Sequence, residues 1–160
     1  MILKSFELDK IDLKNKKFFL LYGENQGHKN EVIEKKFKKI FSSNIFNYEE
    51  AEVINNEEVF FSNILSKSFF ENEKLIIISR VSDKIKDIME EIIEKKIEDL
   101  TIILNSSILD KKSKLRSYFE KNKDTVCIPF YADNSQTLMS IVNNFFREKK
   151  IQISQQTINV

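Results

Sequence analysis

Apolar residues gather in five short runs of strand character, separated by segments in which apolar positions recur with helical period. The runs lie at residues 18–22, 45–48, 75–78, 101–104 and 125–130. The run at 75–78, Leu-Ile-Ile-Ile, has no polar interruption, which is typical of a strand covered on both faces of a parallel sheet. This alternation predicts an α/β fold with an open, mostly parallel five-stranded sheet flanked by helices and joined by right-handed crossovers.

The segments between the runs predict amphipathic helices. Residues 29–41 and 112–121 are expected to be helical, and Asn56 is expected to cap another helix. The apolar positions predicted to face the core are Ile33, Phe37, Ile40 and Phe41, then Val59, Phe60, Ile64 and Leu65, then Ile85, Ile88, Met89, Ile92 and Ile93, and finally Leu115, Tyr118 and Phe119. With only two glycines and one proline in the chain, long regular elements are favoured over tight hairpins.

The alternation of strand and helix patterns ends at the polar stretch 132–135, and no strand pattern of comparable strength follows it. A last helix is expected with an apolar stripe of Leu138, Ile141, Val142, Phe145 and Phe146. A connector at 151–154 then leads toward another helix near Ser154. We therefore expect an α/β domain at 1–134 and the beginning of a small helical domain, cut short, at 135–160.

Charge and composition argue against some classes of function for this protein. The 160 residues carry 26 Lys plus Arg and 25 Asp plus Glu, a net charge of +1, so composition gives no electrostatic footprint for autonomous nucleic-acid binding. Cys127 has no partner for an internal disulfide and lies in an apolar stretch, where a buried, unreactive thiol is expected. No apolar run approaches the length of a membrane span and no signal peptide is evident, which predicts a cytoplasmic protein without membrane contact.

The segment 23–30 follows the first strand and enters a helix, which is where a phosphate-binding P-loop would lie. A P-loop has four residues between its two glycines, followed by Lys and Ser or Thr. Here Gly23 and Gly27 enclose only three residues, His28 and Lys29 follow, and Asn30 stands where a hydroxyl would hold magnesium. We expect this degenerate loop not to bind nucleotide, and we expect His28 and Lys29 to be ordinary surface at a helix entry.

No acidic residue ends the runs at 75–79 or 101–104, where a magnesium-binding Asp would be required. A lone His offers no metal site. Nucleotide hydrolysis, a cofactor and a metal are therefore not expected. The basic segment 110–116 lies at a helix entrance where it could touch DNA phosphates, but without aromatic stacking partners a solvated helix start is favoured.

The segment Ser68, Phe69 and Phe70 places two adjacent aromatic residues between an amphipathic helix and the run at 75–78. Adjacent residues cannot both point into one core from a regular element. Two interpretations stay open: a local hydrophobic plug beneath a loop, or an exposed anchor for a partner. Burying each Phe in a partner would contribute about 1.5 to 3 kcal/mol.

Four segments in one order carry a resemblance to a known family. They are FLLYGE at 19–24, SFF at 68–70 followed by KLIII at 74–78, LDKKSKLR at 109–116, and PFYADN at 129–134. Together they resemble the delta subunit of the bacterial DNA polymerase III clamp loader, in its N-terminal part. The resemblance runs the whole length of the chain.

The resemblance implies an AAA+-like, P-loop-related domain without a working nucleotide site, followed by a helical lid domain beginning near Ser135. It implies a non-catalytic subunit that binds the sliding clamp, the beta subunit of the polymerase, and helps open the ring for loading onto DNA during replication. Ser68, Phe69 and Phe70 fall on the family's clamp-binding element, with Phe69 in place of the more usual Leu.

The resemblance also implies that other loader subunits join through a C-terminal collar domain absent from this chain, and that DNA is met only within the assembled loader. Two rival functions stay open. One is a degenerate P-loop NTPase whose missing residues a partner supplies, which predicts magnesium-dependent ATP binding. The other is an interaction domain for an unrelated partner, which predicts no affinity for a sliding clamp.

Overall fold

Five parallel strands form the centre of the protein in a computed structural model that describes residues 1–4, 7–8, 15–41, 44–66, 73–97 and 99–151. The strands are β1 (Phe18–Gly23), β2 (Ile45–Glu49), β3 (Lys74–Ser79), β4 (Leu100–Asn105) and β5 (Thr125–Phe130). Their order in the sheet is β2-β3-β4-β1-β5. Each predicted run became a strand, which confirms the α/β fold with a five-stranded parallel sheet, and places β1 and β4 side by side at its centre.

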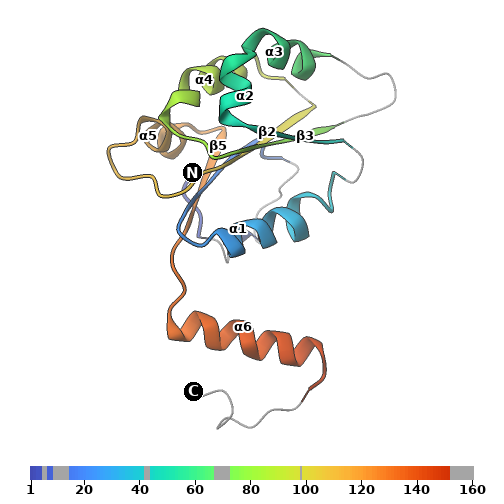
Figure 1. Cartoon of the computed structure of the whole chain (residues 1–160), viewed down its shortest axis with the longest axis vertical. Helices are drawn as coiled ribbons and strands as arrows, with labels where there is room; N and C mark the ends of the chain where they lie inside the picture. Colours follow the sequence, from blue (N-terminus) through green and yellow to red (C-terminus); the bar gives the residue numbers. More distant parts are fainter. Residues whose placement is uncertain (5–6, 9–14, 42–43, 67–72, 98, 152–160) are drawn as a thin grey trace. The chain divides into compact units, whose positions relative to one another are not determined.

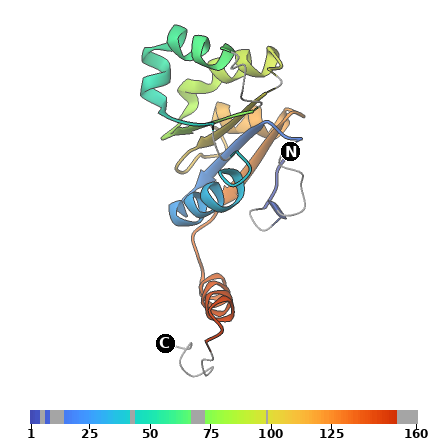
Figure 2. The same cartoon turned by 90° about the vertical axis from the view of Figure 1, so that its right-hand side faces the viewer.

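Helices cover both faces of this sheet (Figures 1 and 2). On one face lie α1 (Gln26–Val32) and a π-helical continuation, η2 (Ile33–Phe37). The other face carries the remaining helices of this layer, namely α2 (Glu50–Asn55), α3 (Glu57–Leu65), a short 3₁₀ turn η3 (Asp83–Ile85), α4 (Lys86–Glu94) and α5 (Lys114–Lys121). The result is a three-layer arrangement of helix, sheet and helix.

Two apolar cores follow from the two-residue repeat of the strands. In β1, Phe19 and Leu21 pack against Phe37 and the rest of the α1 side. Leu20 and Tyr22 point to the opposite face, where they meet the core that includes Met89 of α4. Because every β1 residue before Gly23 is buried on one face or the other, the end of this strand is held firmly in place.

Several helix predictions need correction. The first helix begins at Gln26, three residues before the expected start, because the Asn25 side chain accepts a hydrogen bond from the His28 amide at 3.0 Å and caps it. The fifth begins at Lys114 rather than 112. On α3, Phe60 and Ile64 are buried as predicted, but Val59 is 59% and Leu65 is 49% exposed. Helix α2 was not predicted at all, since its six residues give too short a repeat to recognise.

The outer edge of β5 is covered by the beginning of the chain. Ile2 forms a parallel bridge with Cys127, and the amide of Leu3 donates to the carbonyl oxygen of Cys127 at 3.0 Å. Cys127 is fully buried, and this burial raises the pKa of its thiol to about 12. The prediction of a buried cysteine is confirmed, and the raised pKa disfavours the thiolate, which is the reactive form.

The chain divides into two compact units, Met1–Phe130 and Tyr131–Val160. The second contains α6 (Ser135–Glu148), which begins with a reciprocal capping box between Asn134 and Thr137. None of the residues of α6 is buried. The helix expected near Ser154 lies outside the described residues, and the lid domain at 135–160 stays a prediction. In the described part of the chain, no helix has the length and apolar character needed to span a bilayer.

Candidate functional site

The loop after β1 is the first candidate site, because it lies where a P-loop would cradle phosphates. Gly23 ends the strand with a φ of +125°, and its amide donates to the carbonyl oxygen of Ser107 at 2.9 Å. A Cβ at this position would lie 2.1 Å from the carbonyl oxygen of Phe130. Only glycine fits here, since both the backbone angle and the close approach of β5 exclude a side chain.

Lys29 occupies the space beneath this loop. Its side chain is fully buried, and its ammonium donates to the carbonyl oxygen of Gly23 at 2.9 Å and also to the carbonyl oxygen of Ser106. Gly23 is the last residue of β1 and Ser106 directly follows β4, so one side chain joins the ends of these two neighbouring strands. The expectation that Lys29 is surface is therefore wrong.

The electrostatics of Lys29 follow from its position. Burial lowers the pKa of its ammonium below the ordinary 10.5, because a desolvated charge is costly. Among the described residues, no carboxylate lies within ion-pair distance of it. In a P-loop the lysine extends toward bound phosphate. Here the lysine of the loop instead donates to backbone oxygens of its own domain.

The other predicted loop residues do not complete a phosphate cradle. The ring of His28 packs edge-on against Phe130, with centroids 5.0 Å apart. Gly27 lies in the first turn of α1, where a Cβ would come no nearer than 3.8 Å to the Asn25 side chain. The structure thus brings Gly23 and Lys29 together through a hydrogen bond, in which Gly27 takes no part.

A cleft of about 570 Å³ opens at the carboxyl ends of β2, β3 and β4, where open α/β sheets usually bind ligands. Ser79 ends β3 and Asn105 ends β4, so neither strand supplies a magnesium-binding carboxylate. Glu49 at the end of β2 is paired with Arg80 at 3.1 Å. The buried Oδ1 of Asn105 has no hydrogen-bond partner among the described residues. The acidic side chain in the lining of this cleft thus comes from β2 and is paired with Arg80, whereas the last residues of β3 and β4 are uncharged.

The predicted clamp-binding residues Ser68, Phe69 and Phe70 lie outside the described residues, and the choice between plug and anchor stays open. The elements on either side of them are described. Lys74, the first residue of β3, directs its ammonium to the carbonyl oxygen of Asn63 at 2.9 Å and to the carbonyl oxygen of Ser66. This lysine ties the start of β3 to the end of α3, so the two ends of the intervening segment are held together.

Exposed apolar residues of α3 adjoin this segment. Val59 and Leu65 line a broad, shallow groove of about 830 Å³ together with the half-buried Phe61. Glu57, Glu58 and Glu91 lie along the same groove. This groove therefore combines a few exposed apolar side chains with acidic ones and with Lys95.

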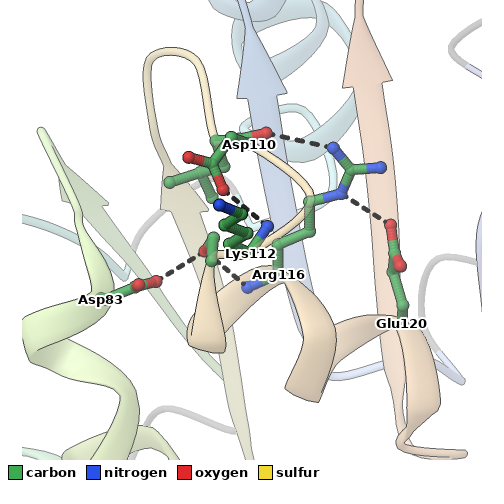
Figure 3. A network of polar contacts seen from close by, with 7 residues as sticks. Asp83, Asp110, Lys112, Arg116 and Glu120 are labelled. Atoms are coloured by element: carbon green, nitrogen blue, oxygen red, sulfur yellow. Dashed lines mark hydrogen bonds and ion pairs between the residues drawn. The ribbon is translucent and has the colours of Figure 1, made fainter.

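The basic segment 110–116 forms a rigid corner at the start of α5 (Figure 3). Asp83 of η3 reaches across and accepts hydrogen bonds from the Ser113 hydroxyl at 2.5 Å, the Leu115 amide at 3.0 Å and the Lys114 amide at 3.1 Å. Burial alone would raise the pKa of Asp83, but these hydrogen bonds outweigh it and hold the pKa below 3.8. Sequence reasoning missed Asp83, because its partners lie 30 residues away, although its position after Ser82 at a helix start is a recognisable capping pattern.

Arg116 also holds the segment 110–116 in place. Its Nε donates to Glu120 at 2.8 Å, its Nη1 donates to the carbonyl oxygen of Leu109 at 3.1 Å, and its guanidinium lies 4.9 Å from the centroid of the Tyr22 ring. The hydrogen bond to Glu120 raises the pKa of Arg116. Asp110 adds an Asx turn by accepting from the Lys112 amide at 2.6 Å. Arg116 therefore acts as a structural tie within the fold.

No group of three or more His, Cys, Asp and Glu side chains is placed to hold a metal ion in the ranges that the structure describes. No family model matches the sequence, and no curated protein matches it. Among solved structures, the chain is similar to a Bacillus subtilis DNA clamp loader delta protein (YqeN), with a TM-score of 0.59 and 15% sequence identity. The match covers 88% of this chain and 46% of that protein, so this chain spans about half of the protein it matches. At this identity the likeness establishes a clamp-loader-like fold.

Proposed function

We propose that this chain is the N-terminal, non-catalytic part of a clamp-loader delta subunit, which binds the DNA polymerase III sliding clamp and helps open the ring during replication. The observation that carries the proposal is the fold match over 88% of the chain to a clamp loader delta protein. The motif resemblance at 19–24, 68–78, 109–116 and 129–134 agrees with that match in chain order. A cytoplasmic location belongs to the same proposal.

Clamp binding is assigned to Phe69 and Phe70. Their segment connects the end of α3 to the start of β3, two elements that Lys74 ties together. Each Phe buried in a pocket on the clamp would contribute about 1.5 to 3 kcal/mol. The groove beside Val59 and Leu65 lies on α3, the helix that precedes this segment in the chain.

Ring opening requires that this surface bind the opened clamp more tightly than the closed clamp, because only differential affinity shifts an equilibrium. ATP is not needed in this chain for that step. Lys29 satisfies its ammonium on the carbonyl oxygens of Gly23 and Ser106, and β3 and β4 end without a carboxylate. We expect no magnesium-dependent ATP binding in a calorimetric titration, and a measurable affinity would favour the degenerate NTPase instead.

The direct test is a calorimetric titration of the cognate clamp with the native chain and with a Phe69→Ala, Phe70→Ala double variant. Loss of both rings should weaken binding by about 100-fold or more, given the burial free energy of two Phe side chains. The circular-dichroism spectrum should stay unchanged if the rings are exposed anchors.

A matched control removes two other exposed apolar side chains, Ile108→Ala and Tyr131→Ala, which are 64% and 76% exposed. This control should bind the clamp as the native chain does. Equal loss in both variants would show nonspecific stickiness, and unfolding of the Phe69, Phe70 variant would show that the pair is an internal plug. A native chain with no affinity for the clamp would point to an unrelated partner.

A further inference from the structure

The cleft of about 570 Å³ at the carboxyl ends of β2, β3 and β4 has an entirely polar lining among the residues that the structure describes. The lining consists of serine hydroxyls, the amides of Gln26, Asn30 and Asn105, and one pair of opposite charges, Glu49 and Arg80. Polar walls are satisfied by hydrogen bonds rather than by apolar contact. A ligand for this cleft should therefore be small and strongly polar.

Asn105, the last residue of β4, contributes a buried acceptor that has no donor. The residue lines the cleft although it is only 7% exposed, and its Oδ1 has no hydrogen-bond partner among the described residues. The next residue is satisfied, because the Ser106 hydroxyl donates to the carbonyl oxygen of Val81 at 2.7 Å. An unpaired buried acceptor is unfavourable. An N–H group of a ligand in the cleft would supply the missing hydrogen bond.

Arg80 has a backbone conformation that residues other than glycine rarely adopt. It directly follows β3 with a φ of +57°, and its side chain reaches the lining of the cleft. One nitrogen, Nη1, donates to Oε2 of Glu49 at 3.1 Å. Its Nε and Nη2 form no hydrogen bond with any described residue. Backbone strain of this kind is concentrated at sites that hold a side chain in place for a ligand.

We propose that this cleft binds a small polar α-amino acid in its zwitterionic form. The opposite charges of Arg80 and Glu49 lie side by side, and the carboxylate and ammonium of an amino acid form the complementary pair. The free edge of the guanidinium is suited to a carboxylate, which it binds through two parallel hydrogen bonds. The ammonium would donate to Glu49 and to Oδ1 of Asn105. This claim does not rest on clamp binding.

The lining argues against other small ligands. A phosphate group, with a charge of about −1.5 to −2, would meet a single arginine whose charge Glu49 offsets, because Lys29 is bound to backbone oxygens. A nucleobase needs an aromatic or apolar surface for stacking, which the described lining does not provide. No metal-holding group of His, Cys, Asp and Glu exists within the described ranges. A zwitterion matches both charges of the cleft.

The test is a titration of the full 160-residue chain with L-glutamine, followed in amide NMR spectra. We expect the signals of Arg80 and Asn105 to shift, with a dissociation constant on the order of 1 mM for so small a ligand. Two analogues test each charge: N-acetyl-L-glutamine lacks the ammonium, and L-glutaminamide lacks the carboxylate. Each should bind about tenfold more weakly, because a charge-assisted hydrogen bond is lost.

Two variants remove the protein groups without disturbing the fold. Arg80→Gly deletes the guanidinium and suits the left-handed backbone, so the Tm should stay unchanged while the affinity falls about tenfold or more. Asn105→Leu keeps the shape of the side chain and deletes an oxygen that has no partner, so the chain should stay folded and bind more weakly.

The matched control is Lys96→Gly, which deletes an exposed positive charge at a φ of +47° after the end of α4, outside the lining of the cleft. It should bind L-glutamine as the native chain does, and equal losses in both glycine variants would overturn the proposal. The proposal also fails if L-glutamine shifts no signal of the cleft, if either analogue binds as tightly, or if inorganic phosphate or ATP binds more tightly. Failure with glutamine alone would leave the clamp titration unaffected, whereas tight ATP binding would also favour the degenerate NTPase.

Discussion

Two groups of lysines in this protein differ in burial and in what their ammonium groups contact. Lys29 is fully buried, and its ammonium donates hydrogen bonds to two backbone carbonyl oxygens at the ends of β1 and β4. Lys111 and Lys112 are exposed on a corner held by other residues, with their ammonium groups turned to solvent. The first is part of the fold, whereas the second pair is available to a partner. The loop after β1 is thus closed by a lysine of its own domain.

The largest effect should come from Gly23 of the degenerate loop, and Gly27 of the same loop provides the contrast. Gly23→Ala should destabilise the protein by at least about 3 kcal/mol, because a positive φ and a Cβ placed 2.1 Å from the Phe130 oxygen force β1 and β5 apart. Gly27→Ala should instead be neutral or stabilise by up to about 1 kcal/mol, since its Cβ, in a helix, would make an ordinary van der Waals contact at 3.8 Å with Oδ1 of Asn25. Urea denaturation measures the free energy of unfolding of both variants. Equal effects would contradict the conclusion that only Gly23 requires glycine.

Lys29→Ala should cost about 2 to 4 kcal/mol in the free energy of unfolding. The change removes a buried aliphatic stem and leaves the carbonyl oxygens of Gly23 and Ser106 without their donor. Lys29→Met keeps most of the stem, so it should recover part of the loss. Lys39→Ala, an exposed lysine on the same side of the sheet, should change stability by less than about 0.5 kcal/mol in the same urea titration.

The pH dependence of unfolding tests whether the Lys29 ammonium is buried in the folded protein. The pKa of Lys29 is lowered by burial, so between that value and the ordinary 10.5 the unfolded chain holds more protons than the folded one. Stability therefore rises with pH in this window. Compared with Lys29→Met, the native chain should gain stability as the pH rises from 7 toward 10.5, and a difference that stays constant would mean that the folded pKa is ordinary.

Asp83→Ala tests the corner that carries the exposed lysines, with a smaller expected cost of about 1 to 2 kcal/mol. Its carboxylate caps α5, and the amides of Lys114 and Leu115 would lose their acceptor. Because the pKa of Asp83 is lowered, its contribution is present above the unfolded pKa near 3.8 and is lost as the pH falls through the folded value. The stability difference between native chain and variant should shrink on acidification below pH 4.

The smallest effect should come from Lys111→Gln with Lys112→Gln. Both side chains are exposed and form no ion pair within the described ranges, so the free energy of unfolding should change by less than about 0.5 kcal/mol. Thermal unfolding followed by circular dichroism is sufficient to measure it. A clear loss of stability would mean that these lysines belong to the fold, as Lys29 does, and would remove the contrast between the two groups.

Local pattern was enough to predict the sheet. The uninterrupted apolar run at 75–78 became a strand that is buried on both faces, as predicted, whereas the run at 45–48, which contains Asn47, became the partly exposed edge strand β2. The same reasoning failed on α3, where Val59 and Leu65 fit a helical stripe but face solvent. A short helix covers only part of a sheet, and the edge of its apolar stripe stays uncovered wherever no neighbour packs against it.

The amino-acid sequence by itself determined the α/β fold, the buried cysteine and the absence of a P-loop, since each depends on residue type and on spacing within one segment. Only the tertiary structure decided the strand order, the burial of Lys29 and the capping of α5 by Asp83. It also decided the gathering of Lys86 with Lys111 and Lys112 in one groove. These features join residues that are distant in the chain, and such contacts are set by how whole elements pack, which no local pattern encodes.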